Sequence, residues 1–347
     1  MKNKINIISF MFFLLLTGSA IAGFFGPKDK QAPIIKLNAQ VTPDIVFMDK
    51  IVIDGQVEDE NMIESLKINH IPVMYEIGNN IFFSYIAKLN VGENVLTIQA
   101  VDEAGNSAEK TIHITRKLPS QIQLSERLSI AVLPFKHEKI MPDAVSGFQD
   151  SLINALTKRN RFQIIERNQI DTILQEQQLS RTRLFDSQTA SKLGRLVSAR
   201  SVITGSIINS DNRIIITAQM IDVETSEVIS QQEIWGGLND PLSAGEMAEG
   251  LALKFHQGFP LVDGHIIEKQ GGSIVVDIGQ HVIKPDRRLI IFRGEPVIHP
   301  VTGENVGLDI QVLGHALVIQ VQQKTAIARL IDCDEATLNL TDRVITE

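Results

Sequence analysis

The hydrophobic pattern of this 347-residue chain changes its period twice, and these changes constrain the fold more than any other feature of the sequence. Residues 32–116 repeat with a period of two, residues 128–259 mix buried strands with helical spacing, and residues 262–347 return to a period of two. The length allows two or three cores of ordinary size. We therefore expect three modules: a β-sandwich, an α/β sandwich and a small all-β barrel.

The first module shows the clearest alternation of buried and exposed positions. The alternating apolar positions are Ile51, Ile53 and Val57, then Leu96, Ile98 and Ala100, then Ile112 and Ile114. Turn residues at 92–94 and 105–106 separate these runs in the rhythm of a β-sandwich. Residues 117–127 are polar and aperiodic, so we interpret them as a linker.

The middle module alternates strands with helices. Strands are expected at 128–133, 162–165, 202–208, 214–223 and 228–235. The expected inner faces of four helices are Val145, Phe148, Leu152 and Leu156; Ile170, Ile173 and Leu174; Ala190, Leu193, Leu196 and Val197; and Met247, Leu251 and Phe255. Asp186 should cap the third helix, and Ser243 with Glu246 should form a capping box for the fourth.

The last module contains short apolar runs separated by Gly, Pro and Asp. Strands are expected at 264–268, 273–278, 288–292, 307–312, 317–321 and 325–330. Their number and spacing predict a small barrel.

The first residues predict export. Lys2 and Lys4 precede an apolar run at 5–16, which is too short for a bilayer span, and Ala20-Ile21-Ala22 has the small-x-small pattern of a cleavage site. We expect a signal peptide at 1–22, a mature chain from Gly23 and a periplasmic location, with outer-membrane association or secretion as further possibilities. An uncleaved membrane anchor is the alternative.

Cysteine and charge exclude several partners. Cys333 is the only cysteine, so we expect neither an internal disulfide nor a lipid anchor on a first-position cysteine. Its neighbours Asp332 and Asp334 oppose thiolate formation, which indicates an inert thiol. The formal net charge of −8 would repel a phosphate backbone, so no nucleic-acid partner is expected.

Two motifs are candidates for a catalytic role. His137-Glu138 begins a zinc-protease pattern, but Met141 stands where the second histidine is required. Glu166 with Arg167 and Glu176 offers an acid/base set; the alternative is an ion pair at the start of a helix. Neither motif predicts an enzyme, and we expect no catalytic residues.

Two groups of residues are candidates for metal binding. The histidines of the last module either converge on a metal or lie apart, and their spacing favours the second interpretation; they are His265, His281, His299 and His315. The acidic run 58–61 either binds calcium or forms a solvated turn, and it lacks the alternating ligand pattern of a calcium loop. We expect no metal, no cofactor and no cofactor-binding residues.

Five stretches of the middle module carry a family resemblance. In order they are Ile130-Ala131-Val132-Leu133-Pro134-Phe135, Phe162-Gln163-Ile164-Ile165-Glu166-Arg167, Gln175-Glu176-Gln177, Leu193-Gly194 and Ile203-Thr204-Gly205-Ser206-Ile207. Together they resemble the CsgG family, named for the curli secretion channel, and the related TolB-N-like cores of envelope proteins. Channel-forming members are lipoproteins that insert amphipathic hairpins, and this chain lacks the lipid-accepting cysteine, so a pore is not expected.

The outer modules carry two further resemblances. Residues 100–106 followed by 111–114 are similar to the final hairpin of bacterial immunoglobulin-like domains. Residues 275–279, 289–293 and 300–304 resemble the C-terminal domain of FlgT, a periplasmic protein of the flagellar basal-body ring that also has a TolB-N-like middle domain. The immunoglobulin-like module replaces the FlgT N-terminal domain here, which leaves attachment to a flagellum in doubt.

The resemblances imply a non-enzymatic scaffold. It would self-associate, as a homo-oligomer or ring, or dock into an envelope complex at the outer membrane, either flagellar-ring-like or curli-secretion-like. One alternative is a periplasmic regulator of a peptidoglycan synthase, because TolB-N-like cores resemble those of its activators. Another is a polysaccharide-binding module, for which Trp235, the only tryptophan, is among the few residues suited to stacking on sugars.

Overall fold

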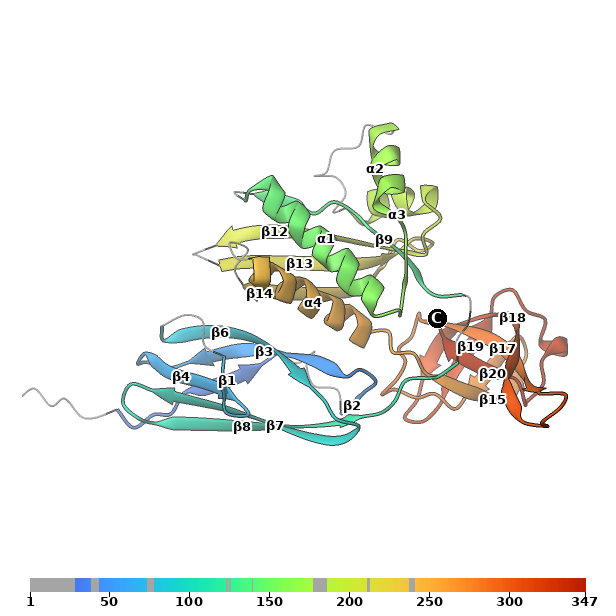
Figure 1. Ribbon diagram of the computed structural model, residues 1–347, viewed down its shortest axis with the longest axis horizontal. Coiled ribbons are helices and arrows are strands. Elements are labelled where there is room, and N and C mark those ends of the chain that lie inside the picture. The colour runs from blue at the N-terminus through green and yellow to red at the C-terminus, as the bar shows by residue number, and fades with distance from the viewer. Residues whose placement is uncertain are drawn as a thin grey trace, which may run out of the picture.

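A computed structural model describes residues 29–38, 44–73, 78–122, 124, 126–138, 140–176, 186–210, 213–236 and 241–347. The expected signal peptide lies outside the described residues. The described chain is mostly β and folds into three regions that pack against one another (Figure 1). A sandwich of two sheets comes first, an α/β region lies beside it, and a closed barrel ends the chain.

Two facing sheets form the first region. The smaller sheet has the order β1 (Ile34–Leu37), β3 (Lys50–Glu58), β6 (Asn80–Lys88); the larger has the order β2 (Ile45–Val46), β8 (Ser107–Arg116), β7 (Gly92–Asp102), β4 (Ile63–Ile68), β5 (Ile71–Pro72). The alternating positions predicted from the sequence, such as Ile53 and Ile98, are fully buried in the core between the sheets. One face of each strand therefore supplies the core, as the period of two requires.

A mixed sheet is the centre of the second region. Its order is β11 (Gln163–Ile164), β9 (Ser129–Val132), β12 (Ser201–Ser210), β13 (Arg213–Asp222), β14 (Val228–Gly236), and β10 (Lys136–Glu138) pairs with β12. The helices α1 (Pro142–Lys158) and α4 (Pro241–Gln257) cover one face, and α2 (Arg167–Glu176) and α3 (Ser187–Leu196) cover part of the other. The apolar helical faces predicted from the sequence pack on this sheet, except that Leu196, expected on the inner face of α3, is 54% exposed.

Of the two helix caps predicted from the sequence, one is correct and the other is wrong. Asp186 caps α3 as expected, because its carboxylate accepts a hydrogen bond of 2.9 Å from the backbone N–H of Thr189. The capping box of Ser243 and Glu246 is wrong, because α4 begins at Pro241 and both residues lie inside it. Proline is favoured in the first turn, where its missing N–H has no intrahelical acceptor.

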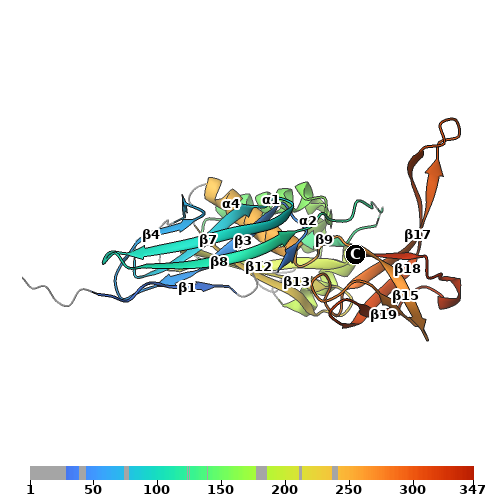
Figure 2. The ribbon, with the colours of Figure 1, turned by 90° about the horizontal axis from the view of Figure 1, so that it is seen from below.

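The third region is a closed barrel with a long hairpin. The strand order is β15 (Asp263–Gln270), β16 (Ser273–Val276), β19 (Ala326–Leu330), β18 (Asn305–Val321), β17 (Arg288–Ile298), β20 (Arg343–Thr346). The two strands expected at 307–312 and 317–321 are one continuous strand, and the strand expected to end at Phe292 extends to Ile298. Irregular register beside Gly314, where φ is 151°, lets β18 bend without breaking. The outer halves of β17 and β18 leave the barrel as a hairpin (Figure 2).

The segment expected to be a linker is packed against the barrel. It contains no strand among its described residues, but Ile122 and Leu124 pack on an apolar cluster of the barrel strands, and the N–H of Ser120 donates to the carbonyl of Leu261. Within the described residues, no helix has the length and apolar character needed to cross a membrane.

Candidate functional site: a cleft between the three regions

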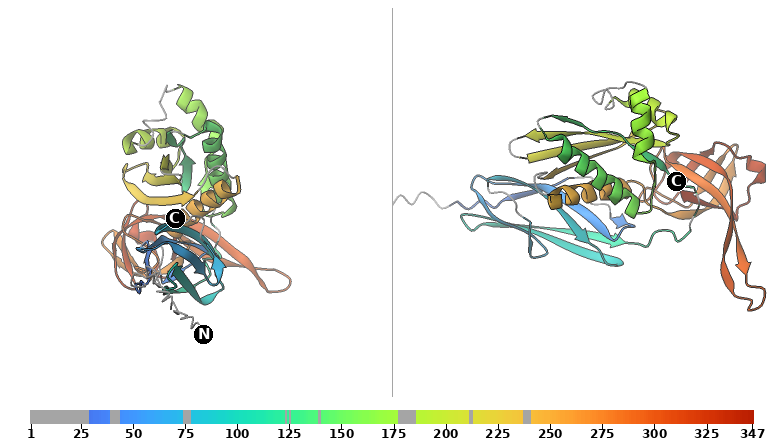
Figure 3. Two further views of the ribbon diagram at one scale, coloured as in Figure 1. Left: turned by 90° about the vertical axis from the view of Figure 1, so that its left-hand side faces the viewer. Right: turned by 45° about the horizontal axis from the view of Figure 1, so that its top comes forward.

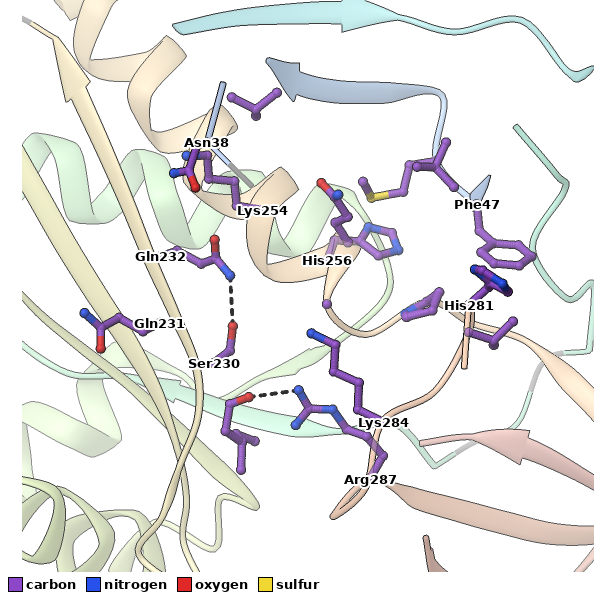
Figure 4. A pocket seen from close by; sticks show the side chains of 18 of the residues that line it. Asn38, Phe47, Ser230, Gln231, Gln232, Lys254, His256, His281, Lys284 and Arg287 are labelled. Carbon is purple, nitrogen blue, oxygen red and sulfur yellow. Dashed lines mark hydrogen bonds between the residues drawn. The ribbon is translucent and has the colours of Figure 1, made fainter. Parts of the chain in front are cut away.

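A cleft of about 1160 Å³ lies where the sandwich, the α/β region and the barrel meet. Its walls come from four segments far apart in sequence: residues 45–52 of the sandwich, strand β14, the end of α4, and the loop 280–287 of the barrel (Figure 4). Packing of the regions positions the walls, because α4 is fixed between β14 and the sandwich strand β3 (Figure 1). The cleft therefore depends on how the regions dock.

A buried ion pair joins two of the regions beside the cleft. The Nζ of Lys254 on α4 lies 2.8 Å from Oδ2 of Asp54 on β3, and the two side chains are 7% and 1% exposed. The same Nζ donates to the carbonyl of Glu233 at 2.6 Å. An apolar contact of Met48 and Val52 with Leu253 lies alongside. These contacts set the width of the cleft.

Strand β14 forms one wall with its free edge. It is the last strand of its sheet and, among the described strands, pairs only with β13. The carbonyls of Ile229 and Glu233 point away from β13, since they accept hydrogen bonds from Arg287 (2.8 Å) and Lys254 (2.6 Å) across the cleft. Strand backbone groups alternate in direction, so the N–H and C=O of Gln231, midway between them, also face the cleft.

Several side-chain N–H groups in the cleft lack a hydrogen-bond partner among the described residues. They are Nε1 of Trp235 and Nε of Arg287; Nδ1 of His256, which is a donor or an acceptor according to the tautomer, is also unpaired, and all three atoms are buried. Lys284 is exposed in the barrel wall and has no ion pair or hydrogen bond to any described residue. Lys284 is therefore open to an anionic partner, whereas the three buried atoms are closed to one.

Burial controls the protonation of two cleft residues. Burial, together with the nearby charges of Arg161 and Arg159, lowers the pKa of His256 to about 3, so its ring is neutral at physiological pH. Burial also lowers the pKa of Arg287 to about 10, which leaves its guanidinium charged. The charge of Lys254 is balanced by Asp54, so two cations in the walls, Arg287 and Lys284, stand against one carboxylate, that of Glu233.

The chemistry that these groups can perform is binding. Ionisable side chains converge in the cleft, an arrangement that active sites also show. However, Lys254 and Arg287 are held by Asp54 and by backbone carbonyls, and a histidine with a pKa of about 3 is a poor general base at neutral pH.

The residues weighed for catalysis lie outside the cleft. His137 and Glu138 are on β10, where Glu138 forms an ion pair of 3.3 Å with Lys136. Arg167 begins α2 and forms ion pairs with Asp150 and Asp171. The helix-start ion pair is therefore present, but its partners are these aspartates and not Glu166.

The four histidines of the last region lie apart. His265 contacts Asp277 at 3.2 Å, His281 is in the wall of the cleft, and His299 lies near the hairpin tip, where its Nδ1 accepts from the backbone at Val301 and Thr302. His315 lies between Asp332 (2.8 Å) and Glu126 (2.9 Å). The metal interpretation is not supported by this placement.

His315 should make the attachment of the linker depend on pH. Burial alone would lower the pKa of His315, but hydrogen bonds to Asp332 and Glu126 outweigh burial and raise it. A raised pKa stabilises the folded state below the ordinary value of 6.5, and this contribution is lost as pH rises through the folded value. We expect the thermal midpoint of the wild type to fall relative to His315→Gln between about pH 5.5 and about pH 8.5. Equal changes in both proteins would contradict this.

The acidic run 58–61 contributes one residue to a larger group. Carboxylate oxygens of Asp59, Asp29 and Asp102 lie within 4.8 Å of one another, the only such group of three among the described residues. Hydrogen bonds already engage them: Asn61 donates to Asp29 at 2.6 Å, and Asn106 donates to Asp102 at 2.7 and 2.8 Å. The backbone N–H of Asn61 also donates to Asp59 at 2.8 Å, so all three carboxylates already accept hydrogen bonds.

Few residues of the cleft can be recognised from the sequence. The sequence indicated Trp235 only as a residue that could stack on sugars. Its ring lies 5.5 Å from the ring of Phe82 and 5.9 Å from Nζ of Lys254. Lys254, Lys284 and Arg287 have no motif, and no local signal marks them. Cys333 is half-buried against the barrel core, with its sulfur 3.7 Å from the carbonyl of Asp334.

Comparison with known proteins found a family match for the middle of the chain. Residues 112–215 match the family model described as "Curli production assembly/transport component CsgG". This confirms the resemblance to the CsgG family found in the sequence of the middle region. The match covers less than a third of the chain; it begins within β8 and ends within β13, before β14 and α4. No curated protein matches the chain.

Solved structures of three envelope proteins are similar to parts of the chain. The LpoB C-terminal domain from Salmonella enterica is 20% identical, with 33% of this chain and 84% of that chain covered and a TM-score of 0.28. The PelC dodecamer from Paraburkholderia phytofirmans is 16% identical, with coverage of 38% and 89% and a TM-score of 0.25. TolB from Acinetobacter baumannii is 12% identical, with coverage of 60% and 58% and a TM-score of 0.26.

Proposed function

We propose that this protein is a non-enzymatic periplasmic scaffold that self-associates or docks into an envelope complex at the outer membrane. The observation that carries the proposal is the CsgG family match at 112–215, because that family model is described as an assembly and transport component. The domain boundaries at 32–116, 128–259 and 262–347, the cleavable signal peptide, and the immunoglobulin-like and FlgT-like identities of the outer regions belong to the same proposal.

The contacts between regions support a role in assembly. The face of α4 that a lone α/β domain would expose is covered by the sandwich through Lys254 and Asp54, and Arg161 joins the α/β region to the chain end by donating to the carbonyls of Phe259 (2.6 Å) and Glu347 (2.5 Å). A rigid arrangement of three regions presents sheet edges and loops in fixed directions, which suits a scaffold.

Light scattering on the purified mature chain tests the proposal. We expect a mass that is a multiple of the monomer mass, or recovery in a complex of defined mass after crosslinking in intact cells. A protein that stays monomeric at every concentration and is recovered uncrosslinked from cells would contradict it. A monomer that changes glycan-chain synthesis by a purified peptidoglycan synthase would instead support the regulatory alternative.

A further inference from the structure

The hairpin of β17 and β18 continues well beyond the barrel. We define the arm as residues 294–311, where the two strands pair with each other and with no other described strand (Figures 2 and 3). At about 3.3 Å per residue, the strand part of the arm reaches roughly 20 Å from the barrel. Residues of the arm do not line the cleft of their own chain.

The arm exposes apolar side chains that its own chain leaves uncovered. The exposed fractions are 43% for Val297, 52% for Ile298, 86% for Val301, 58% for Val306 and 44% for Leu308. Single exposed apolar residues are common on protein surfaces, but five on one short hairpin form a cluster of the kind found at interfaces. The outer edges of both arm strands also have unpaired backbone groups.

The arm is acidic as well as apolar. It contains Glu295, Glu304 and Asp309 and neither lysine nor arginine. Glu295 and Asp309 are directly opposite each other in the strand register, and like charges at such positions disfavour the hairpin in isolation. A cationic surface against this pair would remove the repulsion.

The cleft has the complementary properties. Arg287 and Lys284 outnumber the single carboxylate of Glu233 in its walls, and the edge of β14 offers the backbone groups of Gln231 between the two carbonyls that Arg287 and Lys254 already hold. Phe47 and Met48 add apolar surface to the same walls. An extended acidic segment with apolar side chains would place a carboxylate beside Lys284 and its own backbone against Gln231.

We infer that the arm of one copy binds in the cleft of the next copy, with its carboxylates beside Lys284 and Arg287 and its backbone against Gln231 of β14. The inference rests on the proposed self-association and names its two surfaces. Because the arm and the cleft are different surfaces, the contact is head-to-tail, and repetition closes a ring or extends a filament. Arm docking also covers Val301 and Leu308.

Complementary variants of the full chain test the inference. The arm variant Val301→Asp/Leu308→Asp and the cleft variant Lys284→Glu change exposed residues, and thermal melts would verify folding. We expect each alone to weaken association at least tenfold. Mixed in equal amounts, they retain one intact arm and one intact cleft per pair, so a dimer should form. Lys192→Glu on α3, an exposed lysine away from the cleft, is the matched control and should assemble normally.

A crosslink tests the register directly. In a Cys333→Ser background, Val301→Cys and Gln231→Cys proteins mixed under oxidation should form a disulfide-linked dimer, and the emission of Trp235 should shift on assembly. Oligomers that survive both the arm and the cleft variants would overturn the inference while the proposed function stands. A strictly monomeric wild type would remove both. Loss of assembly in the cleft variant alone would identify another acidic strand as the occupant and also overturn it.

Discussion

Replacing Lys254 by methionine is expected to lower the free energy of unfolding by about 3–5 kcal/mol, because it leaves the buried carboxylate of Asp54 without a counter-charge. Asp54 is 1% exposed and its Oδ1 lacks a hydrogen-bond partner; the amide of Asn38, which donates to Oδ2 at 3.4 Å, is uncharged and does not replace the ammonium. The loss should appear in urea denaturation as a lower midpoint for the transition that separates the sandwich from the α/β region.

Two further variants separate the ion pair from general effects of the substitution. Asp54→Asn combined with Lys254→Met removes both charges and should recover most of the loss. Lys50 forms an ion pair with Glu249 at 3.3 Å in the same interface but is 34% exposed, so Lys50→Met should cost less than about 1 kcal/mol. If Lys254→Met and Lys50→Met lose equal stability, the buried pair does not hold the two regions together.

The second large effect is expected at the barrel end of the arm. Asp342 is fully buried and accepts hydrogen bonds from Arg293 at 2.7 and 2.8 Å and from the N–H of Asn339 at 2.7 Å. Asp342→Ala removes all three, and we expect a loss of roughly 1.5–3 kcal/mol in chemical denaturation, reduced from the value for a fully buried pair because Arg293 is one third exposed. Asp309→Ala, on the exposed arm, is the matched control and should change stability little.

The loss of stability in Asp342→Ala should depend on pH in the acid range. Burial alone would raise the pKa of Asp342, but hydrogen bonds from Arg293 and Asn339 outweigh burial and lower it below 3.8. A lowered pKa contributes stability above the unfolded value and loses it as pH falls through the folded value. The difference between wild type and Asp342→Ala should therefore shrink below about pH 3.8, whereas a constant difference would show that Asp342 acts by packing alone.

Local sequence signals located most elements but not where they end. The cap at Asp186 follows from a hydrogen bond within one turn, so the sequence contains it entirely. The lengths of β17 and β18 do not follow from the sequence, because Pro296 and the turn residues after it usually end strands. Here both strands continue as a two-stranded hairpin, in which no neighbouring strand needs the missing N–H of the proline. The four-residue strand β20 was missed because it is too short to show a period.

The sequence by itself determined the three regions, their cores and the CsgG resemblance, since periodicity and ordered motifs are properties of neighbouring residues. Tertiary structure alone decided the cleft. Its walls come from segments near residues 47, 231, 254 and 284, which no local pattern connects. They meet because the Lys254–Asp54 pair docks the sandwich on α4 and Arg287 reaches the edge of β14, and such long-range contacts depend on how whole cores pack together.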